Sequence, residues 1–422
     1  MQLLYDISVW LVNFLLPLTK YFSPKMKKFV DGRKDTFPIL NSKLKREDSV
    51  IWFHMASLGE FEQGLPIIEV VKKLFPNHKI LVSFFSPSGF EIKKNSPVAD
   101  AVVYLPLDTK KNVRRFLDAA HPELAIFIKY EFWPNYLNEL KSRNITSLLV
   151  SAGFRENQVF FKSYGGWMKK SLGTFKHFFV QNQISKELLN SIGFQNVTVS
   201  GDTRFDRVAN QIGQDNSLEF IEAFKDRKLC VVAGSTWPED EALLEDFINR
   251  SSNEIKFIIA PHNIKPDQIK SFKERLNKKT ILYSEMENKN SSNYQVFIID
   301  TIGLLSKIYS YADIAYVGGA AGNTGLHNIL EPATFGIPIV TGNNFDKFPE
   351  AKQLQELAGL YSVGTKEELA LIFTKLLTDD DFRARTGQIA GHFINSNTGA
   401  TRIVESYLKT IMLKNLNLSH NL

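Results

Sequence analysis

The chain has 422 residues, and 51 Lys plus Arg against 45 Asp plus Glu give a formal net charge of +6. This length predicts two domains, or at most three. Hydrophobic residues make up 44% and charged residues 23%, which excludes global disorder and a collagen-like rod. No run reaches about 18 uncharged apolar residues, which excludes a polytopic membrane protein. One cysteine, Cys230, excludes a disulfide framework, and its apolar neighbours favour a buried side chain over a thiol nucleophile.

Residues 1–35 combine an apolar segment with a basic one. From Leu3 to Leu18 the only charge is Asp6, and apolar residues recur at helical spacing. About 16 residues is short for a membrane span, and a signal-peptide cleavage site is missing. We expect either a shallow membrane anchor or a helix packed on the protein's own core. An anchor would place the following basic residues at anionic head groups: Lys20, Lys25, Lys27, Lys28, Arg33 and Lys34. The basic run matches no known nucleic-acid-binding motif, so we expect no nucleic-acid partner.

After residue 48, short β-branched and aromatic runs alternate with amphipathic stretches such as 60–75 and 110–120. This rhythm predicts βα units around parallel sheets, and therefore an α/β fold. The predicted strands are 50–55, 79–85, 101–104, 124–129, 147–150 and 177–181, then 229–234, 255–260, 280–283, 296–300 and 313–317. The polar stretch 206–217 between the two sets is the expected linker. We expect a last helix at about 401–414.

The two halves open alike, with a strand, a tight turn and a helix start at Ala56–Glu60 and again at Ala233–Glu241. Free backbone N–H groups at such a helix start can bind an anion. Two such domains would place a ligand between them, at the carboxyl ends of their strands.

Two glutamates follow predicted strands. Glu60 could take a proton from a hydroxyl nucleophile, or it could simply favour the dipole of its helix. A helix N-terminus lowers the pKa of a glutamate, so a base here needs burial or a nearby carboxylate to raise it. Glu131 lies beside Phe132 and Trp133, which fits either a site residue or a structural ion pair.

A glycine-rich stretch, 318–325, runs from a strand into an expected helix, with Glu331 one turn inside it. It matches neither a Walker A loop nor the strict dinucleotide fingerprint, which disfavours NTP hydrolysis and hydride transfer. The glycines could let a phosphate approach, Glu331 could accept hydrogen bonds from ribose hydroxyls, or the turn could serve packing alone. Scattered histidines argue against catalytic zinc, and Asp379–Asp381 fits a turn or helix cap better than a metal site.

Five motifs in order resemble the bacterial 3-deoxy-D-manno-octulosonic acid (Kdo) transferases of lipopolysaccharide core biosynthesis. They are Ala56–Glu60, Glu131–Asn135, Gly201–Asp206, Ala260–His262 and Leu326–Pro332. The resemblance runs from the N-terminal anchor to about residue 400. It implies a GT-B fold, with two Rossmann-like domains facing across a cleft. It also implies an inverting, metal-independent transfer from CMP-Kdo, a substrate and not a cofactor, to a lipid A precursor (lipid IVA).

The resemblance also implies site residues. Glu60 would be the general base, and Glu131 and Arg204 would stabilise the transition state. CMP would be held by Pro261, His262, Ile302, Gly303, Leu304, Asn328, Ile329, Leu330 and Glu331. The chain departs from the family pattern at Lys129, often acidic elsewhere, at Arg204, often Lys, and at Leu304, often acidic.

The expected organisation is therefore an anchor at 1–35, an acceptor domain at 36–207 and a donor domain at 213–422, whose last helix could pack back on the acceptor domain. We expect the chain at the cytoplasmic face of the inner membrane. Two alternatives are another GT-B transferase that uses a UDP-sugar, and a non-catalytic, membrane-bound nucleotide-binding module.

Overall fold

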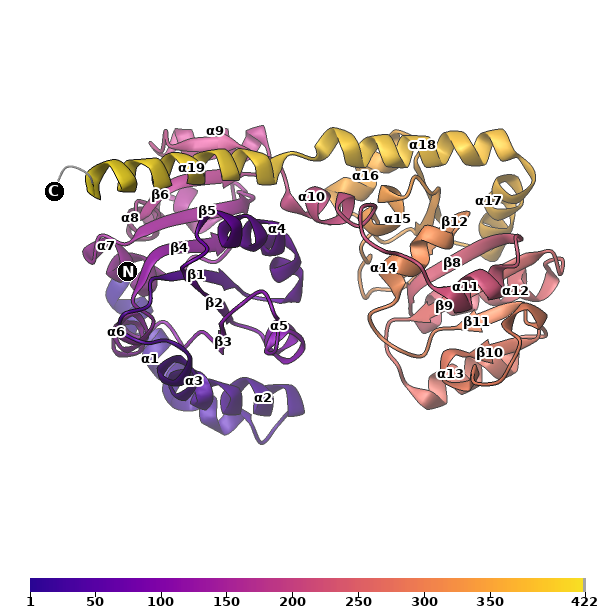
Figure 1. The fold of residues 1–422 in the computed structure, drawn as a ribbon, viewed down its shortest axis with the longest axis horizontal. Helices are drawn as coiled ribbons and strands as arrows, with labels where there is room; N and C mark the ends of the chain where they lie inside the picture. Colours follow the sequence, from indigo (N-terminus) through magenta and orange to yellow (C-terminus); the bar gives the residue numbers. More distant parts are fainter. Residues whose placement is uncertain (420–422) are drawn as a thin grey trace. The chain divides into compact units, whose positions relative to one another are not determined.

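The computed structural model describes residues 1–419, with side chains to residue 411. The chain divides into two units, each of which is visible in Figure 1. Unit 1 is Met1–Arg207 together with the segment that starts at Thr398, and unit 2 is Val208–Asn397. The expected linker is partly helical, because α10 (Thr203–Ala209) continues past residue 206.

Unit 1 is built on a parallel seven-stranded sheet of order β3-β2-β1-β4-β5-β6-β7. Its strands are nearly continuous buried runs, as expected of a parallel sheet covered on both faces. They are β1 (Val50–Met55), β2 (Lys79–Phe84), β3 (Ala101–Tyr104), β4 (Pro122–Ile128), β5 (Thr146–Ala152), β6 (Phe175–Val180) and β7 (Val197–Val199). Its helices are α1 (Gln2–Thr19), α2 (Pro24–Gly32), α3 (Thr36–Lys43), α4 (Leu58–Leu74), α5 (Pro87–Lys93), α6 (Lys110–Ala120), α7 (Pro134–Ser142), α8 (Gly166–Leu172), α9 (Gln183–Ser191), α10 and α19 (Ala400–Ser419).

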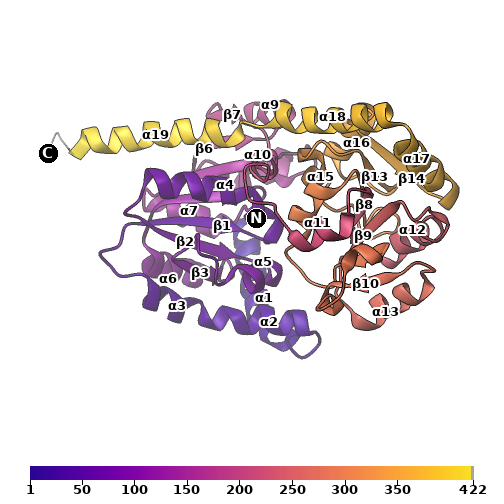
Figure 2. The ribbon, with the colours of Figure 1, turned by 45° about the vertical axis from the view of Figure 1, so that its right-hand side comes forward.

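Unit 2 repeats the plan with a second parallel sheet, of order β10-β11-β9-β8-β12-β13-β14, surrounded by helices (Figure 2). Its strands are β8 (Leu229–Thr236), β9 (Ile255–Pro261), β10 (Thr280–Leu282), β11 (Val296–Ile298), β12 (Ile314–Val317), β13 (Ile339–Gly342) and β14 (Leu360–Val363). Its helices are α11 (Glu219–Lys225), α12 (Pro238–Arg250), α13 (Pro266–Arg275), α14 (Leu305–Ile308), α15 (Leu330–Thr334), α16 (Pro349–Glu356), α17 (Lys366–Thr378) and α18 (Asp380–Asn397).

The last helix, α19, packs against α4 of unit 1. Val404 and Leu408 are buried in the apolar cluster on one face of the first sheet. The carboxylate of Asp206 accepts hydrogen bonds from the backbone N–H groups of Gly399 (2.7 Å) and Thr401 (2.9 Å) and so caps the start of this helix. Unit 1 therefore contains both ends of the described chain, and the range expected for the second domain, 213–422, includes a helix of unit 1.

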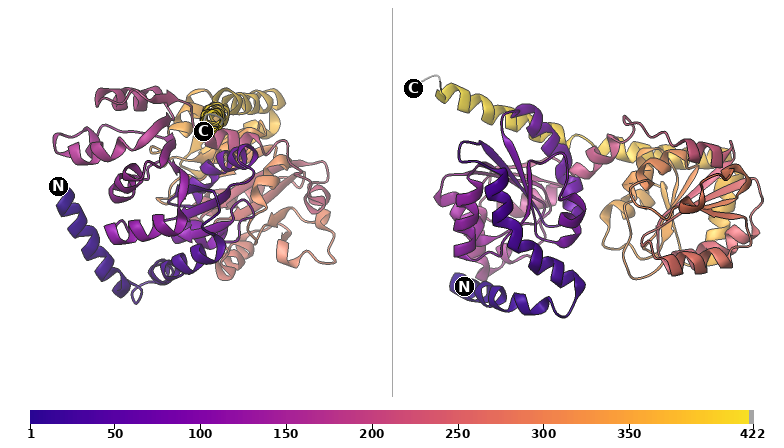
Figure 3. Two further views of the ribbon diagram at one scale, coloured as in Figure 1. Left: turned by 60° about the vertical axis from the view of Figure 1, so that its left-hand side comes forward. Right: turned by 60° about the horizontal axis from the view of Figure 1, so that its bottom comes forward.

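Helix α1 lies on the outside of unit 1 (Figure 3) and has no buried residue. Its apolar side chains are 44–70% exposed, which contradicts the expectation of a helix packed on the core; they are Leu3, Leu4, Ile7, Trp10, Leu11, Phe14, Leu15 and Leu18. With 18 residues and a mean hydropathy of 1.3, α1 is long and apolar enough to cross a membrane by length and composition. The expectation that this segment is too short for a span is therefore corrected.

The polar edge of α1 is bonded to unit 1. The hydroxyl of Tyr5 donates to the buried carboxylate of Asp108 (2.7 Å), which also accepts the backbone N–H groups of Asn135 and Tyr136 at the start of α7. The carboxylate of Asp6 accepts from the side chain of Asn135 (3.0 Å) and pairs with Lys110 (2.8 Å). The helix is thus held by its polar groups, while its apolar face points away from the unit.

One basic residue of the N-terminal cluster has a structural role. The guanidinium of Arg33 donates to the carbonyl oxygens of Leu105 (3.1 Å) and Phe85 (2.7 Å) and stacks on Phe29, 3.6 Å from the ring centre. The exposed lysines Lys25, Lys27 and Lys28 of α2 stay at the surface. Only part of the basic cluster is therefore available to an anionic surface.

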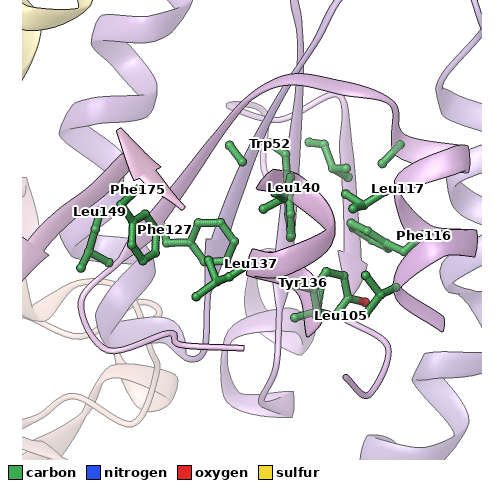
Figure 4. Close-up of a cluster of buried hydrophobic side chains, with 14 of the residues drawn as sticks. Trp52, Leu105, Phe116, Leu117, Phe127, Tyr136, Leu137, Leu140, Leu149 and Phe175 are labelled. Carbon is green, nitrogen blue, oxygen red and sulfur yellow. The ribbon is translucent and has the colours of Figure 1, made fainter. Parts of the chain in front are cut away.

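An aromatic cluster fills one face of the first sheet (Figure 4). Trp52 of β1 packs on Phe116 of α6, Phe127 of β4 and Tyr136 of α7, with ring centres 5.1–5.8 Å apart. All four side chains are inaccessible to solvent. This cluster fixes the position of β1, and hence of the turn that follows it.

Phe116→Ala is expected to lower the free energy of unfolding by about 3–5 kcal/mol, because it removes a fully buried ring and leaves a cavity. Tyr164→Ala, at a side chain that is 60% exposed, should change it by less than about 0.5 kcal/mol. Urea unfolding followed by circular dichroism measures both. Equal effects would contradict the assignment of this cluster as the core of unit 1.

Candidate functional site

Glu60 lies at the first turn of α4, directly after β1, where the first sheet reverses its strand order between β1 and β4. Ligands of doubly wound sheets bind at such switch points. The Glu60 carboxylate accepts hydrogen bonds from the backbone N–H groups of Ala56 and of Ser57, the latter at 3.0 Å, and forms a capping box with Ser57. The N–H groups of Ala56 and Ser57 are therefore occupied by the chain's own carboxylate, so these two are not available to the anion that was expected to bind at this helix start.

Burial raises the pKa of Glu60 to about 7, and the nearby negative charge of Glu131 adds to this effect. The backbone N–H groups of Ala56 and Ser57 and the positive charge of Lys129 act in the opposite direction. Both influences that a base at a helix N-terminus requires, burial and a second carboxylate, are present. Glu60 is therefore able to accept or release a proton near neutral pH.

Glu131 lies in the loop between β4 and α7, at the same switch point as Glu60. Its side chain is 11% exposed, and its Oε2 atom accepts a hydrogen bond from Trp133 Nε1 (2.8 Å) and lies 2.9 Å from His54 Nε2. His54 lies on β1 and is completely buried. The buried carboxylate of Glu131 thus lies against two ring nitrogens. Nothing in the residue pattern alone singled out His54, because its partners come from other strands.

Lys129 directly follows β4 and adopts the left-handed conformation, with φ 68°. Its backbone N–H donates to the carbonyl oxygen of Val150 (2.9 Å), and its ammonium lies 5.3 Å from the ring centre of Tyr130. Its charge stabilises the ionised form of Glu60.

Arg204 begins α10, after β7, at the same edge of the sheet. Its guanidinium pairs with Asp202, with Nε and Nη2 at 2.9 and 2.8 Å from Oδ2. Asp202 also accepts hydrogen bonds from Gln63 of α4 (3.0 Å) and Gln181 (3.1 Å). Burial raises the pKa of Asp202, but the charge and hydrogen bonds of Arg204 outweigh it, so the pKa stays below its ordinary value. The structure therefore places Glu60, Glu131 and Arg204 at one edge of the first sheet.

In unit 2, the corresponding switch point lies between β8 and β12. Trp237 follows β8, and its ring stacks on His262, with centres 4.8 Å apart and planes at 22°. Its Nε1 donates to His327 Nε2 (3.0 Å), and the rings of His262 and His327 lie 4.4 Å apart. Burial lowers the pKa of both histidines, to about 4 for His327, so both are neutral at pH 7. Trp237 and His327 had not been singled out as site residues.

The glycine-rich turn is held by Asp240 of α12. The Asp240 carboxylate accepts hydrogen bonds from the backbone N–H groups of Trp237 (2.9 Å) and Gly319 (2.8 Å) and from the hydroxyl of Tyr316 (2.9 Å). A Cβ on Gly318 would stand 2.8 Å from this carboxylate, and Gly319 has φ 97°. These two glycines are thus required by close packing, which was the alternative explanation of the turn. The backbone N–H of Trp237, which precedes α12, is thus bonded to Asp240 and is not available to an anion.

The other residues expected to hold CMP lie at or after the ends of strands of unit 2. Pro261 ends β9. The turn Ile302, Gly303, Leu304 precedes α14; Ile302 is 78% exposed, and Gly303 has φ 93°. Asn328, Ile329, Leu330 and Glu331 lead into α15, where Asn328 Nδ2 donates to Glu331 Oε1 (3.1 Å). Because residues 318–329 form a loop, Glu331 is the second residue of its helix and does not lie one turn inside it, as expected.

Two minor predictions are confirmed. Cys230 is buried in β8, and burial raises the pKa of its thiol to about 12. Asp379 accepts a hydrogen bond from the backbone N–H of Phe382 (2.9 Å) and so caps the start of α18. Among the residues that the structure describes, no group of three or more His, Cys, Asp or Glu side chains could hold a metal ion.

Comparison with known proteins gives consistent matches. A family model described as 3-deoxy-D-manno-octulosonic-acid transferase (kdotransferase) matches residues 32–207. The 3-deoxy-D-manno-octulosonic acid transferase of Aquifex aeolicus is 31% identical over 344 residues, which are 79% of this chain and 88% of that protein. A bifunctional glycosyltransferase/methyltransferase of Fusobacterium nucleatum is 29% identical over 334 residues, 76% of this chain; the match spans only 51% of that longer protein.

Among solved structures, the UDP-GlcNAc 2-epimerase from Neisseria meningitidis has a similar fold, with a TM-score of 0.60 at 15% identity. The match covers 85% of this chain and 100% of that one. The α/β architecture with two Rossmann-like units is therefore GT-B-like, which confirms the predicted fold class.

Because the pKa of Glu60 is raised above that of a glutamate in the unfolded chain, its ionisation costs folding stability as the pH rises through about 7. Glu60→Gln is therefore expected to raise Tm more at pH 8 than at pH 5. Glu69→Gln, at an exposed position of the same helix, should show no such difference. Differential scanning calorimetry at the two pH values measures this, and an equal effect of Glu60→Gln at both would contradict the raised pKa.

Proposed function

The chain belongs to the family of 3-deoxy-D-manno-octulosonic acid (Kdo) transferases, which are glycosyltransferases, and we propose that it moves Kdo from CMP-Kdo to a lipid A precursor. The observation that carries this proposal is the carboxylate of Glu60 at the switch point of unit 1, with its pKa raised to about 7. A general base is most effective when its pKa lies near the working pH.

In the proposed reaction, the Glu60 carboxylate takes the proton of the acceptor hydroxyl as its oxygen attacks the anomeric carbon of Kdo. The C–O bond to CMP breaks on the opposite face of the sugar, so the configuration inverts. The leaving group is the CMP phosphate, which gains negative charge. Arg204, oriented by Asp202, supplies positive charge for this step. The negative charge of Glu131 helps to raise the pKa of Glu60 and so makes Glu60 a stronger base.

Unit 2 would bind the donor. Residues that follow β9 and β12 lie where nucleotides bind in doubly wound sheets. The neutral ring of His262 can donate a hydrogen bond to a phosphate oxygen, and the Glu331 carboxylate can accept hydrogen bonds from ribose hydroxyls. We assign the contacts with CMP to these two residues together with Pro261, Ile302–Leu304 and Asn328–Leu330.

The acceptor is a lipid, so the enzyme must reach a membrane surface. We propose that α1 lies in the interface of the cytoplasmic leaflet of the inner membrane. Its apolar face is exposed, and its polar edge is bonded to Asp108, Asn135 and Lys110 of unit 1. A helix that crossed the bilayer would have to break these contacts, whereas an interfacial helix keeps them. The exposed lysines of α2 would then meet anionic head groups.

Glu60→Gln is expected to lower the rate of Kdo transfer at least about 100-fold, because an amide cannot accept the proton of the acceptor hydroxyl. The affinity for CMP should stay unchanged, since the proposed CMP contacts lie in unit 2. Mass spectrometry of lipid products and calorimetric titration with CMP measure the two effects. A variant that still transfers Kdo at the wild-type rate would contradict the role of Glu60.

The double variant Leu11→Glu/Phe14→Glu is expected to lose binding to vesicles with roughly 30% anionic lipid, because two charges would enter the apolar face of α1. The matched change Tyr164→Glu, at an exposed residue of unit 1 outside α1, should bind as wild type. Flotation of the full chain with vesicles measures this, and undiminished binding of the double variant would contradict the proposed anchor.

A further inference from the structure

His54 is a buried titratable group that the proposed reaction does not use. It lies on β1 with no solvent exposure, between Ser83 of β2 and Glu131. Its Nδ1 atom is 2.8 Å from Ser83 Oγ, and its Nε2 atom is 2.9 Å from Glu131 Oε2. Partners on both ring nitrogens fix the orientation of this buried imidazole, and the hydrogen bonds that those partners make decide its tautomer.

The indole N–H of Trp52 decides the direction of the hydrogen bond between Ser83 and His54. Trp52 Nε1 lies 2.7 Å from Ser83 Oγ, and an indole N–H can only donate. Ser83 Oγ therefore accepts from Trp52 and directs its own proton elsewhere. The nearest acceptors are His54 Nδ1 at 2.8 Å and the carbonyl oxygen of Phe53 at 3.5 Å. We assign the Ser83 proton to His54 Nδ1, because Ser83 Oγ is nearer to this nitrogen (2.8 Å) than the carbonyl oxygen of Ser83 is (3.2 Å). Trp133 Nε1 lies 3.1 Å from His54 Nε2 but only 2.8 Å from Glu131 Oε2, so we assign its proton to Glu131. The proton of His54 is then on Nε2, directed at Glu131.

The result is a chain of donors that runs from Trp52 through Ser83 and His54 to Glu131. The indole N–H of Trp133 reaches the same Glu131 oxygen (2.8 Å). Hydrogen bonds to an ionised carboxylate are about twice as strong as neutral ones, and a polarised chain strengthens them further. Both donors are held by aromatic packing: the ring centre of His54 lies 5.8 Å from that of Phe127, and the ring centre of Trp133 lies 4.7 Å from that of Phe85. One oxygen of Glu131 is thus fixed from two sides.

After burial, the largest influences on the pKa of Glu60 are the charge of Glu131, from the loop after β4, the hydrogen bonds from the backbone N–H groups of Ala56 and Ser57, and the charge of Lys129, which follows β4. Of these, only Glu131 favours the protonated form of Glu60, so the base is sensitive to the position and charge of Glu131.

We propose that His54, oriented by Ser83, is a positioning residue that holds the Glu131 carboxylate in place within electrostatic reach of Glu60. This inference rests on the proposed function of Glu60 as the base. Without the His54 donor, the Glu131 carboxylate would move, its field at Glu60 would weaken, and Glu60 would become a weaker base.

The two ring nitrogens can be tested separately with a matched pair of variants. The amide of Gln reaches the position of Nε2 and can still donate to Glu131, whereas the shorter Asn reaches only the position of Nδ1. His54→Asn is expected to lower kcat by about 10–100-fold, the effect of losing a hydrogen bond to a charged group. KM for CMP-Kdo should stay within about 2-fold, because donor contacts lie elsewhere. His54→Gln should retain kcat within about 3-fold of the wild-type value.

A second readout does not need turnover. Titration of carboxyl-labelled glutamates by ¹³C NMR should place the pKa of Glu60 at about 7 in the wild type and lower in His54→Asn, with His54→Gln close to the wild type. His177→Asn, a change at a half-buried histidine of β6, is the control and should alter neither kcat nor the Glu60 titration.

The inference is overturned if Asn and Gln at position 54 lower kcat equally, or if the Glu60 titration is the same in His54→Asn and the wild type. Either result would make His54 a purely structural residue, and thermal unfolding of the variants would report only that role. If the wild-type protein does not turn over CMP-Kdo, the proposed function fails, while the titration of Glu60 still tests the effect of His54.

Discussion

The burial of the Glu60 carboxylate beside a second carboxylate, Glu131, at the carboxyl edge of the first sheet is the constraint on which the proposed chemistry depends. A glutamate at the N-terminus of a helix is normally held ionised by the backbone N–H groups and the helix dipole. At Glu60 burial and the charge of Glu131 reverse that preference, so the pKa is raised to about 7 although two backbone N–H groups contact the carboxylate. The aromatic cluster around Trp52 fixes β1, and the hydrogen bonds of His54 and Trp133 fix Glu131. The position of both carboxylates thus follows from the packing beneath them.

The two units share one structural feature, an acidic residue in the first turn of the helix after the switch-point strand, but the residue has a different role in each unit. In each, a strand at the switch point leads into a helix whose third residue is acidic and closes on the backbone before it: Glu60 in unit 1 and Asp240 in unit 2. Burial raises the pKa of both. Asp240 is enclosed by Tyr316 and the backbone of Gly319, so its hydrogen bonds hold the glycine-rich turn. Glu60 is only half-buried, so an acceptor hydroxyl can approach it from solvent.

Much of this architecture can be predicted from the sequence, because buried parallel strands are continuous apolar runs with sharp ends. The ranges 50–55 and 101–104 were predicted to the residue. Strands β7, β13 and β14 were missed; they are three or four residues long and lie next to glycines and polar loops. The length of the apolar helix was underestimated because Gln2 and Thr19 are polar, yet they complete its 18 residues.

The candidate site was predictable only in part. Glu60, Glu131 and Arg204 follow strands, and the resemblance to a family singled them out. His54 and Asp202 could not be found in this way, because their roles arise from partners on other elements: Ser83 for His54 and Gln63 for Asp202. Trp237 and His327 are 90 residues apart in sequence and meet only through the sheet order of unit 2. Sequence spacing carries no information about such contacts between strands.

The central claim is that a carboxylate with a raised pKa activates the acceptor in a Kdo transfer. The most direct test is the pH dependence of single-turnover transfer by the wild-type chain, with CMP-Kdo and a tetra-acylated lipid A precursor, and with the product identified by its mass. The account predicts an acceptor lipid heavier by Kdo, formed at a rate that rises with pH to a plateau, with a midpoint near the pKa of about 7 of Glu60. A rate that is flat between about pH 5.5 and 8.5, or no Kdo transfer at any pH in that range, would contradict it.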